Sequence, residues 1–168
     1  MRVEPRLLAG AMLALWAVAP AGTRQRSAAE PALTIDGEVN RSFTLAELRA
    51  LPRVTVTASE HGAPPATYEG VGLGTIMETA GVPLGAALRG PRMATYVIVT
   101  AADQYRALFA LPELNSAITG RTIVLADRKA GADLDAREGP LRIVAPDERR
   151  PARWVRQVVR LTVRQLRD

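Results

Sequence analysis

An arginine inside a short apolar run, residues 139–146, constrains this chain more than any other stretch of its sequence. In Gly-Pro-Leu-Arg-Ile-Val-Ala-Pro, the Gly-Pro step predicts a turn that delivers an extended chain, and the second proline closes the segment. The apolar residues predict a short buried strand over residues 141–144. Alternation then places Arg142 opposite Leu141 and Ile143. A buried, unpaired charge costs several kcal/mol, so Arg142 must meet a ligand or an internal partner.

A second arginine follows that strand and directly precedes a tryptophan. These two residues are Arg153 and Trp154. Guanidinium groups make bidentate contacts with phosphate, sulfate and carboxylate groups. We therefore expect Arg142 and Arg153 to bind one anion together. The alternative is an internal ion pair with Asp103 or Asp147.

Composition excludes several other chemistries. The 168 residues include no cysteine, which excludes disulfides, thiolate metal sites, a cysteine nucleophile and a lipoprotein anchor. The single histidine, His61, argues against a multi-histidine metal site and a Ser-His-Asp triad. His61 is still a candidate ligand or proton carrier, against the simpler interpretation of an exposed side chain. The net charge of +5 is only mildly basic, and no basic run interleaves with aromatics, so we expect no nucleic-acid partner.

The N-terminus has the pattern of a secretory leader. Two arginines, Arg2 and Arg6, precede an uncharged and mostly apolar run of 13 residues, 7–19, followed by Ala-Pro-Ala. This pattern predicts cleavage after Ala21. The alternative is a membrane anchor, but a span needs ~20 apolar residues. We expect a signal peptide over residues 1–21, a flexible lead-in over 22–32, a folded domain over 33–164, and a periplasmic or secreted protein without a stable membrane anchor.

The remaining sequence predicts an α+β fold in which short helices lie on a mixed sheet. A capping box formed by Thr44 and Glu47 starts a brief helix. The segment 68–71 is expected to lead into a helix over residues 73–80, which Gly81 ends. Residues 129–138 are expected to form a mobile loop. Strands are expected at residues 33–39, 53–57, 95–100, 105–111, 122–126, 141–144 and 159–164.

Taken in order, these segments resemble the molybdopterin-binding domain of the sulfite oxidase type, over about residues 33–163. The segments that carry the resemblance are Leu-Thr-Ile-Asp-Gly (33–37), Phe-Thr-Leu-Ala-Glu-Leu (43–48) with Leu-Pro (51–52), Tyr-Glu-Gly-Val-Gly-Leu (68–73), Ala-Asp-Gln-Tyr (102–105), residues 139–146 and Arg-Trp-Val-Arg (153–156). The resemblance implies the fold of that family and, as a cofactor, molybdopterin.

Several positions of this chain depart from the pattern that the resemblance implies. In such enzymes a cysteine thiolate ligates molybdenum from the loop after the strand that residues 54–57 resemble, and here that loop has no cysteine. Arg142 falls near the cofactor and anion pocket of the family, and Arg153 at a basic position before the tryptophan. The Asp-Gly-Tyr turn of the family is Asp103-Gln104-Tyr105 here, which makes Asp103 and Tyr105 candidate binding residues.

These observations favour an exported binding module for an anionic small molecule, with no catalytic residue assigned. We expect no metal site, no bound cofactor and no classical molybdenum redox chemistry. Two alternatives stay open. One is a molybdopterin-dependent oxidoreductase, or a subunit of one. The other is an interaction partner of an exported or membrane redox protein.

Overall fold

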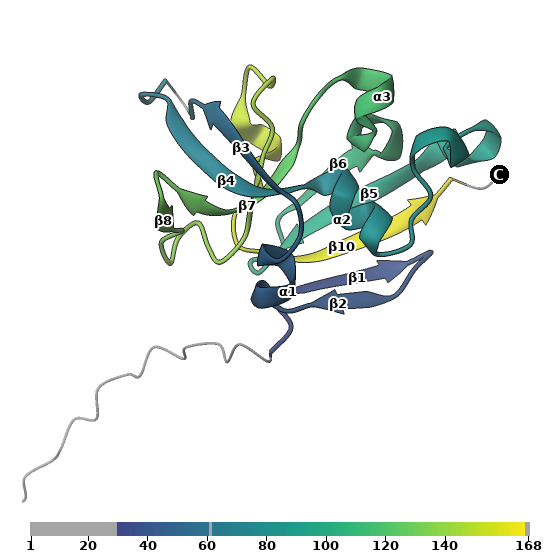
Figure 1. Cartoon of the computed structure of the whole chain (residues 1–168), viewed down its shortest axis with the longest axis horizontal. Coiled ribbons are helices and arrows are strands. Elements are labelled where there is room, and N and C mark those ends of the chain that lie inside the picture. The colour runs from purple at the N-terminus through teal and green to yellow at the C-terminus, as the bar shows by residue number, and fades with distance from the viewer. Residues whose placement is uncertain (1–29, 61, 167–168) are drawn as a thin grey trace, which may run out of the picture.

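Two β-sheets form the body of the molecule in the computed structural model, which describes residues 30–60 and 62–166. Figure 1 shows the first sheet on the right and the second sheet on the left. The first sheet has the order β2-β1-β10-β5-β6, and the second has the order β3-β4-β7-β8 with β9 paired to β7. The strands are β1 (Leu33–Gly37), β2 (Arg41–Phe43), β3 (Arg53–Ala58), β4 (Ala66–Gly72), β5 (Thr95–Ala101), β6 (Arg106–Ala110), β7 (Val124–Lys129), β8 (Ala132–Asp133), β9 (Arg142–Val144) and β10 (Val158–Gln165).

The first sheet joins the two ends of the described chain. Strands β1 and β10 pair in parallel, with Thr34 opposite Arg160, whereas the other neighbours in this sheet are antiparallel. Gly37 ends β1 at a φ of +99°, and a Cβ atom there would lie 2.0 Å from the carbonyl oxygen of Val163. Only glycine fits this close approach. The predicted α+β class and mixed sheet are thus confirmed, with a second, antiparallel sheet added.

Two segments of the second sheet contain more strand than the sequence predicts, as does β2 of the first sheet. Residues 68–71 lead into α2 as predicted, but they do so as part of strand β4, which pairs with β3 on one side and β7 on the other. This pairing buries Tyr68 and Val71. Residues 129–138 are also not simply a mobile loop, since Lys129 ends β7 and pairs with Ala132 of β8.

The helices are short and begin or end where the sequence predicts. In α1 (Leu45–Arg49), the Thr44 side chain accepts from the Glu47 N–H, and the Glu47 carboxylate accepts from the Thr44 N–H, so the capping box is confirmed. Helix α2 (Leu73–Thr79) is followed by Gly81 at a φ of +91°. The remaining turns are α3 (Ser116–Thr119) and the 3₁₀ turns η1 (Gly85–Ala87), η2 (Gly90–Ala94), η3 (Leu111–Leu114) and η4 (Pro151–Arg153).

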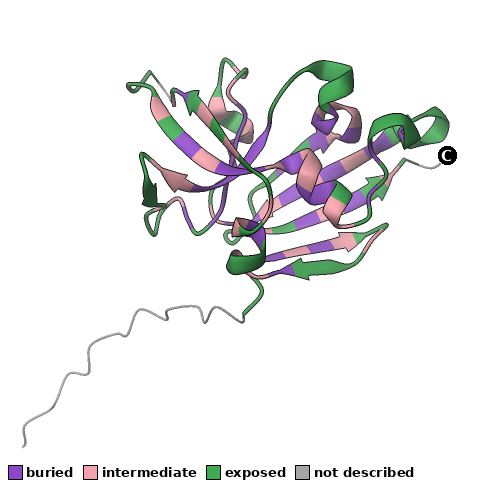
Figure 2. Ribbon diagram, viewed as in Figure 1, coloured by how far each residue is buried: buried purple, intermediate pink, exposed green. Residues whose placement is uncertain are grey.

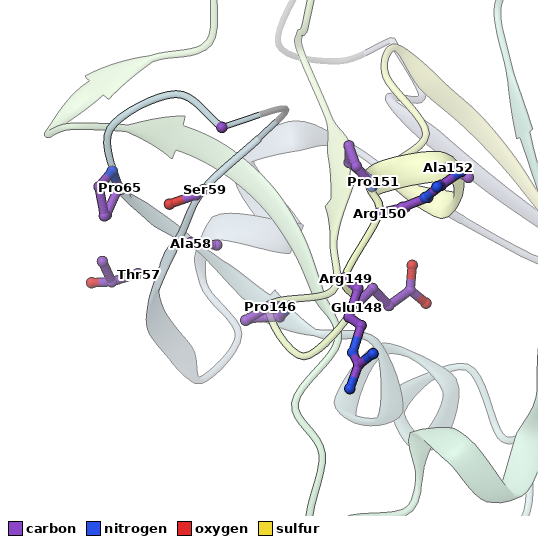
Figure 3. A pocket seen from close by; sticks show the side chains of 11 residues that line it. Thr57, Ala58, Ser59, Pro65, Pro146, Glu148, Arg149, Arg150, Pro151 and Ala152 are labelled. Carbon is purple, nitrogen blue, oxygen red and sulfur yellow. The ribbon is translucent and has the colours of Figure 1, made fainter.

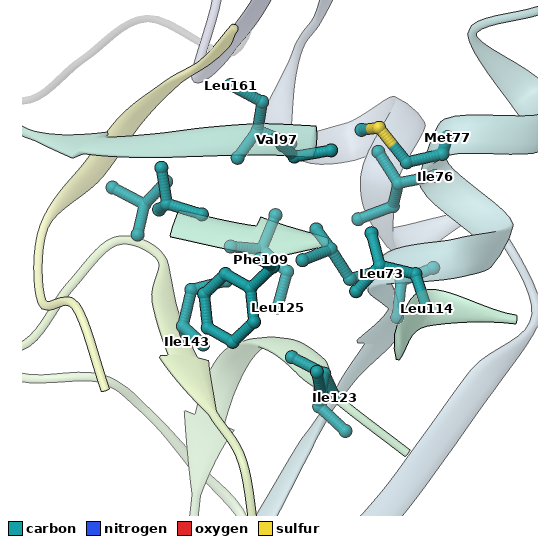
Figure 4. Packing of buried hydrophobic residues seen from close by; sticks show 14 of the residues in the cluster. Leu73, Ile76, Met77, Val97, Phe109, Leu114, Ile123, Leu125, Ile143 and Leu161 are labelled. Atoms are coloured by element: carbon teal, nitrogen blue, oxygen red, sulfur yellow. The ribbon is translucent and has the colours of Figure 1, made fainter. Parts of the chain in front are cut away.

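One hydrophobic core joins both sheets and α2. Burial alternates along β5, which has a neighbouring strand on each side, as expected for a strand with one face on the core (Figure 2). Figure 4 shows α2 contributing Ile76 and Met77 to the same cluster as Val97 of the first sheet and Ile143 of the second. Strand β9, which carries Arg142, is therefore anchored in the core.

Of the predicted N-terminal segments, the structure describes only the last residues of the lead-in. Ala32 is buried and its N–H donates to the carbonyl of Phe43, so it is already part of the fold. The predicted signal peptide and most of the lead-in lie outside the described residues. Within residues 30–60 and 62–166, no helix has the length and apolar character needed to cross a membrane.

Candidate functional site

The guanidinium of Arg142 is fully buried and lies against two aromatic rings. Strand β9 pairs with β7, placing Arg142 opposite Ala126, and all three residues of β9 are buried. The guanidinium carbon lies 5.5 Å from the centroid of the Tyr68 ring and 5.6 Å from that of Trp154. The two rings meet edge to face. Ring faces attract cations, more strongly when water is excluded, so the two rings contribute attraction to the Arg142 guanidinium.

Two glutamates, rather than the expected aspartates, neutralise Arg142. Its Nη2 donates to Oε2 of Glu60 at 3.1 Å, and its Nη1 lies 2.8 Å from Oε1 of Glu138. The structure therefore shows the internal ion pair that was the alternative for Arg142. Neither Asp103 nor Asp147 is its partner, because the loop after β3 and the segment before β9 bring the two glutamates to it.

The contacts continue into a network of five charged side chains. Nη2 of Arg156 donates to the second carboxylate oxygen of Glu60 at 2.6 Å. Nζ of Lys129 donates to Glu138 at 3.0 Å. We call Glu60, Lys129, Glu138, Arg142 and Arg156 the charge network. Three cations and two carboxylates leave it with one excess positive charge.

The carboxylate of Glu60 is held in its charged form by its neighbours. Burial acts to raise its pKa, but the hydrogen bond from Arg156 and the charge of Arg142 outweigh burial, and the pKa lies below its ordinary value of 4.5. The same hydrogen bond raises the pKa of Arg156. For Lys129, burial acts to lower the pKa, but the hydrogen bond to Glu138 and neighbouring charges raise it. Glu60, Lys129 and Arg156 are therefore charged at neutral pH.

The hydrogen-bonding capacity of Arg142 is only partly used. Its Nε and Nη1 are buried and make no hydrogen bond within the described part of the chain. The 2.8 Å contact between Nη1 and Glu138 is thus a charge contact whose alignment does not suit a hydrogen bond. Since a buried donor without an acceptor is costly, this guanidinium can still gain from an additional oxygen.

A surface hollow of about 470 Å³ lies beside this network. We call it the Arg156 hollow; its lining includes Glu60, Asp103, Tyr105, Arg137, Trp154 and Arg156. Two of the predicted site residues are therefore here. Oδ1 of Asp103 accepts from the Tyr105 N–H at 2.9 Å, and the Tyr105 hydroxyl donates to the carbonyl of Ala152 at 2.7 Å. These bonds hold the Tyr105 ring at the edge of the hollow.

Arg153 lies away from Arg142 and has different partners. Its Nε donates to Glu148 at 2.7 Å and its Nη2 to Glu113 at 3.1 Å, while its guanidinium carbon lies 4.3 Å from the centroid of the Phe109 ring. The expected convergence of the two arginines on one anion is therefore not seen, because η4 directs Arg153 toward β6 and η3. The other predicted site residue, His61, lies outside the described residues.

A larger hollow, of about 920 Å³, is lined in part by the loop that follows β3. We call it the Ser59 hollow; Thr57, Ala58, Ser59 and Pro65 form one side, and residues 146 and 148–152 form the other (Figure 3). Its lining area is mostly apolar. The loop in which the resemblance implies a molybdenum-ligating thiolate lines this hollow, and Ser59 of that loop carries a hydroxyl instead.

Comparison with protein families gives a match over residues 21–167, which is most of the chain, to the oxidoreductase molybdopterin binding domain. This chain belongs to that family. A solved structure, the sulfane dehydrogenase SoxCD from Paracoccus pantotrophus, is 23% identical with a TM-score of 0.62, covering 78% of this chain and 37% of that one. At this identity the match supports the fold alone, and this chain spans little more than a third of that relative's length. No curated protein matches the sequence.

The donor atoms of this chain do not fit a thiolate-ligated molybdenum. No cysteine is present in the sequence. Among residues 30–60 and 62–166, no group of three His, Asp or Glu side chains is placed to hold a metal ion. Arg142, which the resemblance places near the cofactor pocket, is engaged by Glu60 and Glu138 of the same chain.

The two glutamates of the charge network, Glu60 and Glu138, had no local sequence signal. Arg142 stood out because it interrupts an apolar run, whereas Glu60 sits in a polar loop where a carboxylate is unremarkable. Glu138 lies in an equally polar segment, and Arg156 belongs to the Arg-Trp-Val-Arg segment, which does not indicate its partner. Lys129 had one signal that could have drawn attention to it, since it is the single lysine among 22 basic residues.

Proposed function

We propose that this protein is an exported module that binds an anionic small molecule, and that it does not perform thiolate-ligated molybdenum chemistry. The observation that carries the proposal is the carboxylate of Glu60, which is held between the guanidinium groups of Arg142 and Arg156 at 3.1 and 2.6 Å. This arrangement supports an anionic ligand, because two converging guanidiniums favour a group with two or more oxygens.

The surroundings of the two arginines suit a small ligand. The Arg156 hollow, at about 470 Å³, falls within the range of small-molecule sites, ~300–1,000 Å³. Arg137 adds a cation to its lining, and Trp154 and Tyr105 supply aromatic surface. Arg156 is half exposed, with 49% of its side chain accessible, so it can contact a ligand without rearrangement of the core.

Family membership by itself favours the alternative of a molybdopterin-dependent oxidoreductase or a subunit of one. The donor set argues against it, because hydroxyl and imidazole groups do not reproduce the soft, strongly donating thiolate. The N-terminal leader pattern supports export. The roles proposed for the residues of the charge network are to bind and orient the ligand.

Anion titration of the purified chain tests the proposal. Thermal melts and isothermal titration with phosphate, sulfate and citrate, in chloride at constant ionic strength, should give a saturable rise in Tm for the wild type. Arg156→Gln should abolish most of that rise. Arg160→Gln is the matched control, because Arg160 is exposed and pairs with Asp36 outside the hollow. Absence of saturable binding by all three anions would overturn the proposal.

A further inference from the structure

We propose that Glu60 is a displaceable internal ligand of this site, and that an external carboxylate or other oxyanion binds by replacing its side chain between Arg142 and Arg156. This inference rests on the proposed function, because it concerns how the same site is filled. It also assigns the ligand class: a compact group whose two oxygens reach two separate guanidiniums.

The side chain of Glu60 lies between the Arg156 hollow and Arg142. Its side chain is 15% exposed and lines the Arg156 hollow, whereas Arg142 is 0% exposed and lies behind it. Arg156 is on the open side of the same carboxylate. A ligand in the hollow therefore meets Arg156 first, and reaches Arg142 only when the Glu60 side chain rotates away.

Glu138, the other glutamate of the charge network, has different contacts from those of Glu60. Glu138 contacts Arg142 and also accepts from Lys129, so it is fixed between two cations inside the network. Glu60 binds the two arginines from the hollow side. It follows β3, whose pairing with β4 ends at Ala58 and Ala66, so rotation of its side chain breaks no hydrogen bond of the sheet.

Charge favours replacement of Glu60 by another anion over simple loss of its carboxylate. With Glu60 in place, the network has three cations and two carboxylates. Without it, three cations face one carboxylate, which leaves an excess of two positive charges around the fully buried Arg142. Nε of Arg142, which makes no hydrogen bond within the described residues, is a further donor available to a ligand with more oxygens than a carboxylate.

Competition between the Glu60 side chain and an external anion predicts how the affinity for that anion should change when Glu60 is replaced. A side chain attached next to its own binding site acts at an effective concentration in the millimolar range or above. The apparent affinity of an external ligand is reduced by the fraction of molecules in which the site is open. Removing the carboxylate of Glu60 should therefore tighten the binding of small anions by at least tenfold.

Chemical rescue is the direct test. Glu60→Ala should melt at a lower temperature than the wild type in chloride, and formate or acetate at equal ionic strength should restore part of the loss in a saturable manner. Isothermal titration should show formate binding at least tenfold more tightly to Glu60→Ala than to the wild type. Glu113→Ala is the matched control, because it removes a carboxylate from Arg153 outside the hollow, and it should show no such gain.

Equal formate affinity in Glu60→Ala and wild type would overturn the inference, as would an equal gain in Glu113→Ala. If Glu60→Ala does not fold, Glu60→Gln keeps the shape of the side chain and should still bind formate more tightly than the wild type. Displacement can fail while the proposed function stands. Wild type that binds phosphate with no gain in either Glu60 variant contradicts displacement alone. A gain in the variants with no binding by wild type contradicts both, because Glu60 then occupies the site without being displaced.

Discussion

Replacing Arg142 with methionine should lower the free energy of unfolding by about 3 kcal/mol. Removing one partner of a buried ion pair costs about 3–5 kcal/mol, because the other charge is left uncompensated. The lower end applies here, since Glu60 keeps Arg156 at 2.6 Å and Glu138 keeps Lys129 at 3.0 Å. Methionine also fills part of the space beside the two aromatic rings, which limits the cavity.

Urea unfolding of the wild type and the variant measures this loss. Arg160→Met is the control, because its ion pair with Asp36 is 54% exposed on the arginine side, and exposed pairs contribute at most about 1 kcal/mol. Neutralising Glu60 and Glu138 together with Arg142→Met should recover part of the stability, since no buried charge is then stranded among these three. A loss below about 1 kcal/mol for Arg142→Met, with an unchanged urea dependence, would refute the reasoning.

Three further predictions follow from other residues. The folded-state pKa values of Glu60 and Glu113 lie below their ordinary value of 4.5. Their stabilising contributions are therefore complete above that pH and are lost as the pH falls through the folded pKa. In urea unfolding, Glu60→Gln should lose more stability relative to the wild type at pH 7 than at pH 3. Gln104 has a φ of 72° at the turn where the resemblance implies glycine, so Gln104→Gly should raise stability by about 0.5–1 kcal/mol, and a lower Tm would contradict this. Expression with export should yield a chain that begins at Gly22, measured by intact mass, whereas an uncleaved chain held in the membrane would contradict the expected signal peptide.

Local sequence signals predicted much of the fold because they act over a few residues. The capping box at Thr44, the stop at Gly81 and the alternation of β5 need only neighbours along the chain. Strand β4 was missed because its conformation depends on partners on both sides, β3 and β7, while its own sequence contains Gly70 and runs straight into α2. Pairing between segments distant in the sequence overrode the local pattern.

The sequence predicted that Arg142 needs a partner, but not which residues would supply it. The apolar neighbours of Arg142 required it to have a counter-charge, and the structure supplies one. Glu60 lies 82 residues away, and no local pattern connects a polar loop to a strand at that separation. The same limit applies to Arg153, whose place before Trp154 gave no indication that it turns to Glu113, 40 residues earlier.

Molybdenum content tests the central claim most directly, that this family member binds anions without a thiolate-ligated metal. The chain should be expressed with its leader in a host that makes molybdopterin, beside a cysteine-containing member of the family as a positive control. Elemental analysis, with mass spectrometry of the small molecules released, should find molybdenum far below one atom per chain. About one molybdenum per chain, together with released molybdopterin, would contradict the account.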